Sequence, residues 1–226
     1  MALIAEDLLL LLFDDVSGKK TTDATRLDYA LGGAVLLELA LAARVDVTEK
    51  QGWLGRTRVV VLDATPTGDS VLDDALTLLR TGKAREPQSA VTSLSKKLRA
   101  ALLGRLVERG VLRREQDRVL GVFPRERWPV NDATHERALR SRLHDVLVVG
   151  VASDPRTSAL IALLSAIDQA HKVIDAPDRK AVKARAKAIG AGDWAGDAVR
   201  KAVQATQAAL TATVVAASVA ASSGGS

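Results

Sequence analysis

The residues most able to do chemistry in this sequence are three histidines and two pairs of adjacent aspartates. His135, His144 and His171 are 9 and 27 residues apart, so no two of them have the i, i+4 spacing of a helical metal pair. We expect these histidines at the surface or lightly buried. The paired carboxylates Asp14–Asp15 and Asp73–Asp74 point in different directions on a helix or loop, so capping and solvation explain them better than acid–base catalysis.

Other common catalytic groups are missing from the 226 residues. There is no cysteine, which excludes disulfides, thiolate nucleophiles and cysteine metal sites. No nucleophile elbow, phosphate-binding loop, dinucleotide fingerprint or zinc-protease motif occurs, and the glycine pair Gly32–Gly33 lies in an apolar run where it permits close helix packing. The sequence therefore predicts a protein that is not an enzyme and has no cofactor or metal.

Aromatic residues are scarce, at 3% of the chain, which is too few for a platform that stacks nucleic-acid bases. Two of them, Trp53 and Phe123, each fall in an expected β-hairpin. An exposed ring there could insert into a lipid interface, and a ring buried under the hairpin is the alternative. We take Trp53 and Phe123 as candidate membrane contacts.

Charge is distributed unevenly along the chain. The overall net charge is +5, but residues 79–142 carry 16 basic and 7 acidic side chains, a net charge of +9. Such a basic block attracts phosphate-bearing partners, either lipid head groups or nucleic acid. The alternative is that these side chains only solvate a helix and a hairpin.

Hydrophobic periodicity predicts a mainly α protein that forms a single globular domain over residues 1–221, followed by a flexible tail at 222–226. A secretory signal is not expected, because Glu6 and Asp7 stand where such a signal needs positive charge. We also expect no membrane-spanning segment, since no apolar run approaches the roughly 20 residues needed to cross a bilayer. The expected helices cover residues 25–43, 71–80, 89–106, 134–152, 155–175, 177–189 and 193–221.

Two short β-hairpins are also expected. The first pairs Val45 and Val47 with the β-branched run at 57–62, and the second places its turn at Gln116 and Asp117. The long helix between them, at 89–106, is amphipathic and basic. The basic residues that lie off its apolar face are Lys96, Lys97, Arg99 and Arg105.

Four motifs together resemble the Golgi phosphoprotein 3 family in order and spacing. They are LDYALGGAVLLELALAARV (27–45), TPTGDSVLDDAL (65–76), LVERGVL (106–112) and DPRTSALIALLSA (154–166). The resemblance covers nearly the whole chain and includes no catalytic motif. It implies a buried helical bundle wrapped by amphipathic helices and, in eukaryotic relatives, a peripheral membrane adaptor that binds phosphatidylinositol 4-phosphate.

The resemblance also implies which residues hold the head group. Two basic positions of the family pocket correspond to Lys96 and Arg99, which would share one face of the expected helix because they are three residues apart. The family's arginine in the central helix corresponds to Gly32, and its tryptophan to Asp23, so half of that pocket differs. Arg26 is a candidate to supply part of the missing charge.

Two functions from different classes follow from these observations. The first is a non-catalytic protein, cytoplasmic and attached to the cytoplasmic face of a membrane, whose partners are anionic phospholipid head groups. Client proteins and further copies of this chain are also candidate partners. The alternative is a winged-helix-like nucleic-acid binder, because a basic helix runs into a hairpin. Against it, an expected loop of about eight residues separates that helix from the one before it, whereas a helix-turn-helix needs about three or four.

Overall fold

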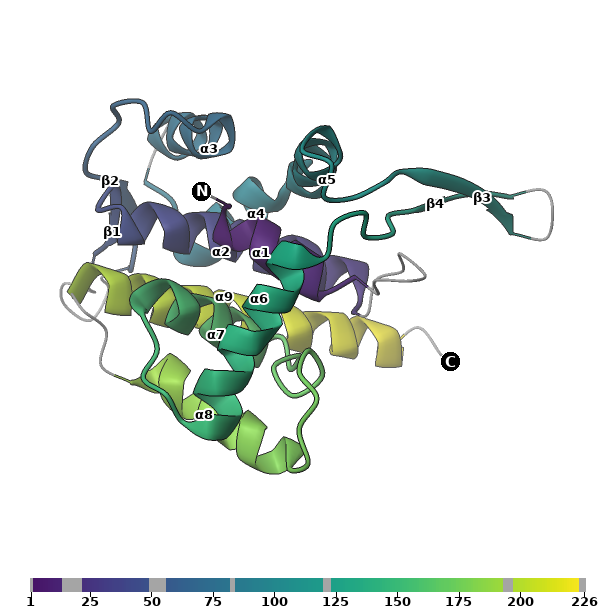
Figure 1. The fold of residues 1–226 in the computed structure, drawn as a ribbon. Helices are drawn as coiled ribbons and strands as arrows, with labels where there is room; N and C mark the ends of the chain where they lie inside the picture. Colours follow the sequence, from purple (N-terminus) through teal and green to yellow (C-terminus); the bar gives the residue numbers. More distant parts are fainter. Residues whose placement is uncertain are drawn as a thin grey trace.

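The computed structural model describes residues 2–13, 22–48, 56–81, 84–119, 123–192 and 197–223. At its centre is helix α2, Ala24–Leu41, which begins at an aspartate cap, Asp23, and is buried along most of its length. Apolar residues all round α2 require neighbours on every side. Those neighbours are α1 (Ile4–Leu11), α4 (Pro87–Ser95), α7 (Pro155–Ala166) and α9 (Asp197–Ser223). Figure 1 shows α2 between these helices, which confirms the expected mainly α bundle.

The first predicted hairpin is confirmed. β1, Val45–Val47, pairs antiparallel with β2, Val59–Val61, and Val45 lies opposite Val61. Helix α3, Ser70–Arg80, follows β2 and also matches its predicted range. The Asp69 carboxylate caps α3 by accepting hydrogen bonds from the first-turn backbone.

The predicted long basic helix is two helices. α4 ends at Ser95, and α5, Leu98–Glu108, begins after Lys96 and Lys97. Lys97 has φ of +61°, a left-handed conformation that no α-helix continues through. Three hydroxyls near the end of α4 donate to backbone carbonyls one turn earlier, which weakens the helix slightly and favours a bend there. Those hydroxyls belong to Thr92, Ser93 and Ser95.

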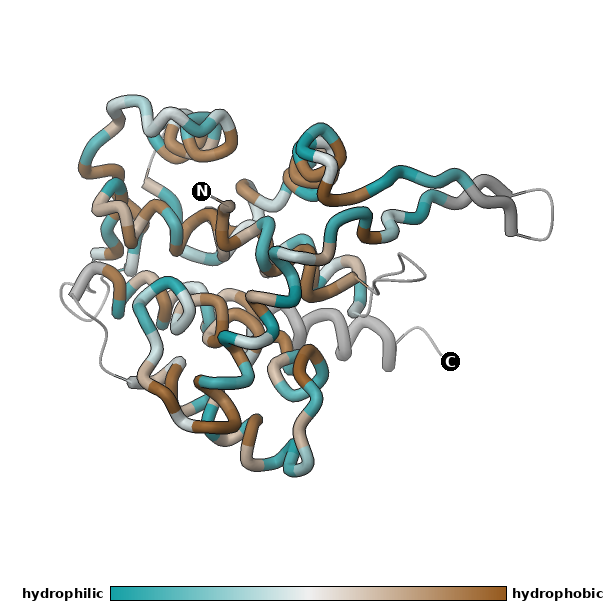
Figure 2. The backbone as a smooth tube through the Cα atoms, viewed as in Figure 1, coloured by the Kyte–Doolittle hydropathy of each residue, from teal (hydrophilic) through white to brown (hydrophobic). Residues whose placement is uncertain are grey.

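The second predicted hairpin is present, but its predicted turn was wrong. β3, Glu115–Val119, contains Gln116 and Asp117 as strand residues and pairs antiparallel with β4, Phe123–Arg127. Both strands are rich in charged residues, and Glu115 pairs with Arg127 across them. The hairpin extends away from the helices (Figure 1) and its stem is hydrophilic (Figure 2).

The C-terminal half contains α6 (Thr134–His144), a π-helical segment at Asp145–Val149, α7, α8 (Arg179–Ala191) and α9. Two predicted helices were too long. The first stops before Gly150, which has φ of +102°, and α7 stops at Ala166, shortly before Asp168 at φ of +57°. Helix α9 extends to Ser223, and the rest of the expected tail lies outside the described residues.

The core lies where α1, α2 and α7 meet. Every residue of α1 is buried, including the two acids Glu6 and Asp7. Among the described residues, the buried hydrophobic ones form a cluster to which all three helices contribute. Within the described ranges, no helix combines the length and the apolar character needed to cross a membrane.

Candidate functional site

The junction between α4 and α5 brings two lysines to the surface side by side. Lys96 and Lys97 are both exposed, and neither forms an ion pair within the described part of the chain. Lys96 ends α4 and Lys97 precedes the first turn of α5. The expectation that Lys96 and Arg99 share one helical face was therefore wrong, because the helix breaks between them.

Helix α5 begins without a side-chain cap. No side chain of a described residue accepts a hydrogen bond from its first-turn amides, and a cation, Lys97, occupies the cap position. The partial positive charge of a helix N-terminus then adds to the charge of the two lysines. Among the described helices, four others instead begin with a carboxylate that accepts these bonds: Asp23, Asp69, Asp154 and Asp178.

Arg99 contacts an acidic residue that the sequence analysis did not single out. Its Nε lies 3.4 Å from Oδ1 of Asp28 on α2, and both side chains are about one-third exposed, at 31% and 32%. Nη1 of Arg99 is buried and has no hydrogen-bond partner among the described residues. Arg99 therefore stands next to the two lysines with part of its charge balanced and one donor unused.

Arg26 is not brought to the lysines by any hydrogen bond or ion pair of the described residues. It lies in the first turn of α2, where its backbone N–H donates to Asp23 Oδ1 at 3.1 Å. This bond, followed by that from Thr25, holds the pKa of Asp23 below its ordinary value. An aspartate two residues before the predicted helix was the signal for this cap.

Gly32 permits close packing of α2, as predicted, and the structure shows that the partner is α4. A Cβ added there would lie 2.5 Å from the carbonyl oxygen of Val91 and 3.0 Å from the nitrogen of Ser95. This spacing leaves no room for the arginine that the family pocket has at the position. The site must therefore differ from that pocket.

Two further cations, one in α5 and one directly after it, serve the fold. Arg105 makes paired hydrogen bonds of 2.8 and 2.7 Å to Asp69, and its Nε lies 3.3 Å from Glu6. Arg109 donates to the same buried Glu6 at 2.9 Å. The bonds from Arg105 hold the pKa of Asp69 below its ordinary value. We call these two acids and their two arginine partners the acid cluster. It connects α1, α3 and α5, and its members are Glu6, Asp69, Arg105 and Arg109.

An open cavity of about 330 Å³ lies at the α4–α5 junction and is lined by both buried and exposed residues. Apolar side chains from α2, α3, α4 and α5 form most of its wall, and Lys96, Lys97 and Asp74 contribute its charged groups. Sequence analysis could not find this cavity, because it exists only where α3 packs beside the break between α4 and α5.

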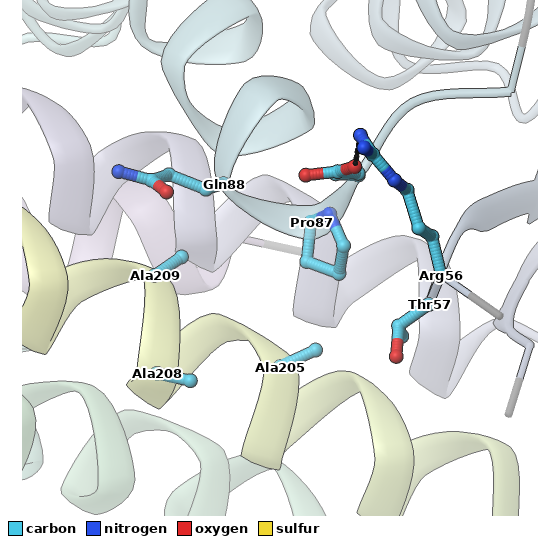
Figure 3. A pocket seen from close by; sticks show the side chains of 8 residues that line it. Arg56, Thr57, Pro87, Gln88, Ala205, Ala208 and Ala209 are labelled. Atoms are coloured by element: carbon cyan, nitrogen blue, oxygen red, sulfur yellow. Dashed lines mark hydrogen bonds and ion pairs between the residues drawn. The ribbon is translucent and has the colours of Figure 1, made fainter. Parts of the chain in front are cut away.

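A larger hollow of about 500 Å³ lies at the start of α4 and carries balanced charge. Arg56 and Glu86 pair across it at 2.8 Å, and alanines of α9, such as Ala205, face them (Figure 3). Because its two charges neutralise each other, this hollow attracts an anion less than the α4–α5 junction does.

The histidines and the two candidate aromatic residues do not belong to the α4–α5 junction. His135 is 48% exposed and its Nε2 lies 2.7 Å from Oδ1 of Asp7, a contact that the sequence did not reveal. No group of three potential ligands in the described ranges could hold a metal ion. Phe123 begins β4, its side chain is not described, and Trp53 lies outside the described residues.

Comparison with known proteins identifies the family. The family model described as Golgi phosphoprotein 3 (GPP34) matches residues 4–206. Vacuolar protein sorting-associated protein 74 of Eremothecium gossypii is 29% identical over 165 residues, which is 64% of this chain and 49% of that protein. The protein of the same name in Schizosaccharomyces pombe is 26% identical over 161 residues, covering 64% and 48%. The chain thus spans about half the length of the curated relatives it matches. Since the family model covers most of its sequence, the chain belongs to the Golgi phosphoprotein 3 family.

Proposed function

We propose that the protein is a non-catalytic, peripheral membrane protein that binds anionic phospholipid head groups at the α4–α5 junction. The observation that carries this proposal is the pair of exposed lysines, Lys96 and Lys97, at the uncapped start of α5. Both are available to an external anion, because neither has an acidic partner among the described residues. Ammonium groups and free backbone N–H groups are the donors that phosphate oxygens accept.

Selectivity for one lipid should be low. The residues that differ from the family pocket, Gly32 and Asp23, have structural roles here in helix packing and capping. The remaining cations recognise charge more than the shape of a sugar head group. We therefore include phosphatidylinositol 4-phosphate as one ligand among several anionic lipids.

A sorting role belongs to the same proposal. The relatives are named for vacuolar protein sorting and the family for the Golgi, which supports an adaptor at the cytoplasmic face of a membrane. Phe123 and Trp53 remain predicted membrane contacts. The hairpin that carries Phe123 extends away from the helices, which supports a membrane contact on this element.

Sedimentation with vesicles tests the proposal. We expect wild type to bind phosphatidylcholine vesicles that contain phosphatidylserine or phosphatidylinositol 4-phosphate. Lys96→Glu with Arg99→Glu should bind about thirtyfold more weakly, because each basic residue near a bilayer surface contributes about 1 kcal/mol. The matched control is Lys180→Glu with Lys187→Glu, which changes charge equally on exposed positions of α8. Equal binding by both double variants, or no binding by wild type at low salt, would refute the site.

One structural observation supports the nucleic-acid alternative, and another opposes it. α3 ends at Arg80 and α4 begins at Pro87, so the objection to a helix-turn-helix made of these two helices stands. By contrast, α4 and α5 are joined by only two residues and followed by the β3–β4 hairpin, an arrangement that the sequence analysis did not consider. However, α5 exposes Ala100, Ala101 and Glu108, while Arg105 and Arg109 bind internal acids. A mobility shift of duplex DNA at low salt, stronger than vesicle binding at the same salt, would favour this alternative.

A further inference from the structure

The cavity at the α4–α5 junction is walled by apolar side chains from four helices. Val35 comes from α2, Val71 and Leu78 from α3, Leu94 from α4 and Leu98 from α5. Figure 1 shows α3 and α5 on either side of α4. The volume of about 330 Å³ is at the lower end of the roughly 300–1,000 Å³ found for small-molecule sites. An apolar wall of this size favours a hydrocarbon group.

The charged groups of the cavity lie on residues exposed to solvent. Lys96, Lys97 and Asp74 are all exposed, and Asp74 forms no ion pair with a described residue. Two ammonium groups against one carboxylate leave net positive charge around an apolar interior. A molecule with an anionic head and an apolar tail matches both the positive charge and the apolar wall.

The size of the cavity limits the number of tails. A lipid with two chains would bring a second chain for which this cavity offers no separate space. An alcohol or a cationic amphiphile would fill the interior but leave the ammonium groups without an anionic partner. We infer that the cavity binds a single-chain anionic amphiphile of the fatty-acid class, its chain among Val35, Leu78 and Leu98 and its carboxylate on Lys96 and Lys97.

This inference shares Lys96 and Lys97 with the proposed function but requires no membrane. A bilayer contacts exposed cations, whereas a monomeric fatty acid must enter the apolar interior. Blocking the interior while keeping both lysines therefore separates the two. Ala75, buried on α3, and Ala101, exposed on α5, both line the cavity and can be enlarged to leucine.

Isothermal titration calorimetry with octanoate, decanoate and dodecanoate below their aggregation concentrations tests the inference. We expect affinity to rise about fourfold per methylene until the chain fills the cavity. Decanol and decyltrimethylammonium should bind at least about tenfold more weakly than decanoate, because neither offers an anion to the lysines. Absence of decanoate binding, or equal binding of decanol, would overturn the inference.

Variants of the cavity wall test where decanoate binds. Ala75→Leu and Ala101→Leu should each abolish decanoate binding and leave vesicle binding unchanged. Since Ala101 is exposed, Ala101→Leu keeps the test valid even if Ala75→Leu does not fold. Lys97→Gly, which retains the left-handed backbone, should weaken decanoate binding about tenfold, while Lys187→Gly on α8 should not weaken it. Decanoate binding by both leucine variants at wild-type strength would show that the cavity is not its site.

Discussion

At the residue scale, the contact that most affects the proposed site is the ion pair between Arg99 and Asp28. The two side chains are partly exposed and 3.4 Å apart, so the pair contributes little to stability. Its electrostatic effect on the site matters more, because Asp28 places a negative charge beside the cations that would meet a phosphate. Asp28 therefore weakens the attraction of the junction for anions.

Replacing Asp28 tests this balance. Asp28→Asn should strengthen binding to anionic vesicles severalfold, since it removes one negative charge beside Arg99. The measurement is vesicle sedimentation, and the control is Asp175→Asn, which removes an exposed charge between α7 and α8. If Asp28→Asn binds more weakly than wild type, the carboxylate positions Arg99 and our interpretation of the pair is wrong.

At the element scale, the close contact between α2 and α4 depends on Gly32. A Cβ there would lie 2.5 Å from a backbone oxygen of α4, so a side chain forces the two helices apart. We expect Gly32→Ala to lower the free energy of unfolding by about 2 kcal/mol. Gly104→Ala in α5 is the matched control, because nothing lies within 4 Å of its added Cβ, and it should raise stability by about 0.5–1 kcal/mol. Urea denaturation measures both changes, and a Gly32→Ala variant as stable as wild type would contradict the close contact.

Sequence periodicity predicted the helices well where one apolar stripe runs inside one helix, as in α2 and α3. It failed at the α4–α5 break because Leu94, Leu98 and Leu102 keep helical spacing across it, while Lys97 leaves the helical conformation. The candidate cations were found from their type and from the family resemblance. The cavity, the partner of Arg99 and the acid cluster around the buried Glu6 arise from contacts between distant segments, which a pattern along one segment does not contain.

At the scale of the whole molecule, the acid cluster joins three helices that are far apart in the sequence. Glu6 is fully buried on α1 and is approached by Arg105 of α5 and by Arg109 directly after α5. Asp69 at the start of α3 binds Arg105. Charge in the interior is tolerated only when paired, so these bonds fix how α1, α3 and α5 meet. The same three-helix arrangement places α3 beside the α4–α5 junction and thereby forms the wall of the cavity.

The pH dependence of unfolding tests the role of this cluster. The hydrogen bonds from Arg105 lower the pKa of Asp69 in the folded protein, so their stabilisation is fully present above the unfolded value of about 3.9 and is lost as pH falls through the lower folded value. Asp69→Asn retains a residue that caps helices well but loses the charge, and should cost about 2 kcal/mol at pH 7. This difference from wild type should shrink as the pH falls below about 4. Urea denaturation across this pH range measures the difference in free energy of unfolding, and Asp74→Asn is the control. A difference that stays constant to about pH 3 would show that the charge of Asp69 does not stabilise the junction of the three helices.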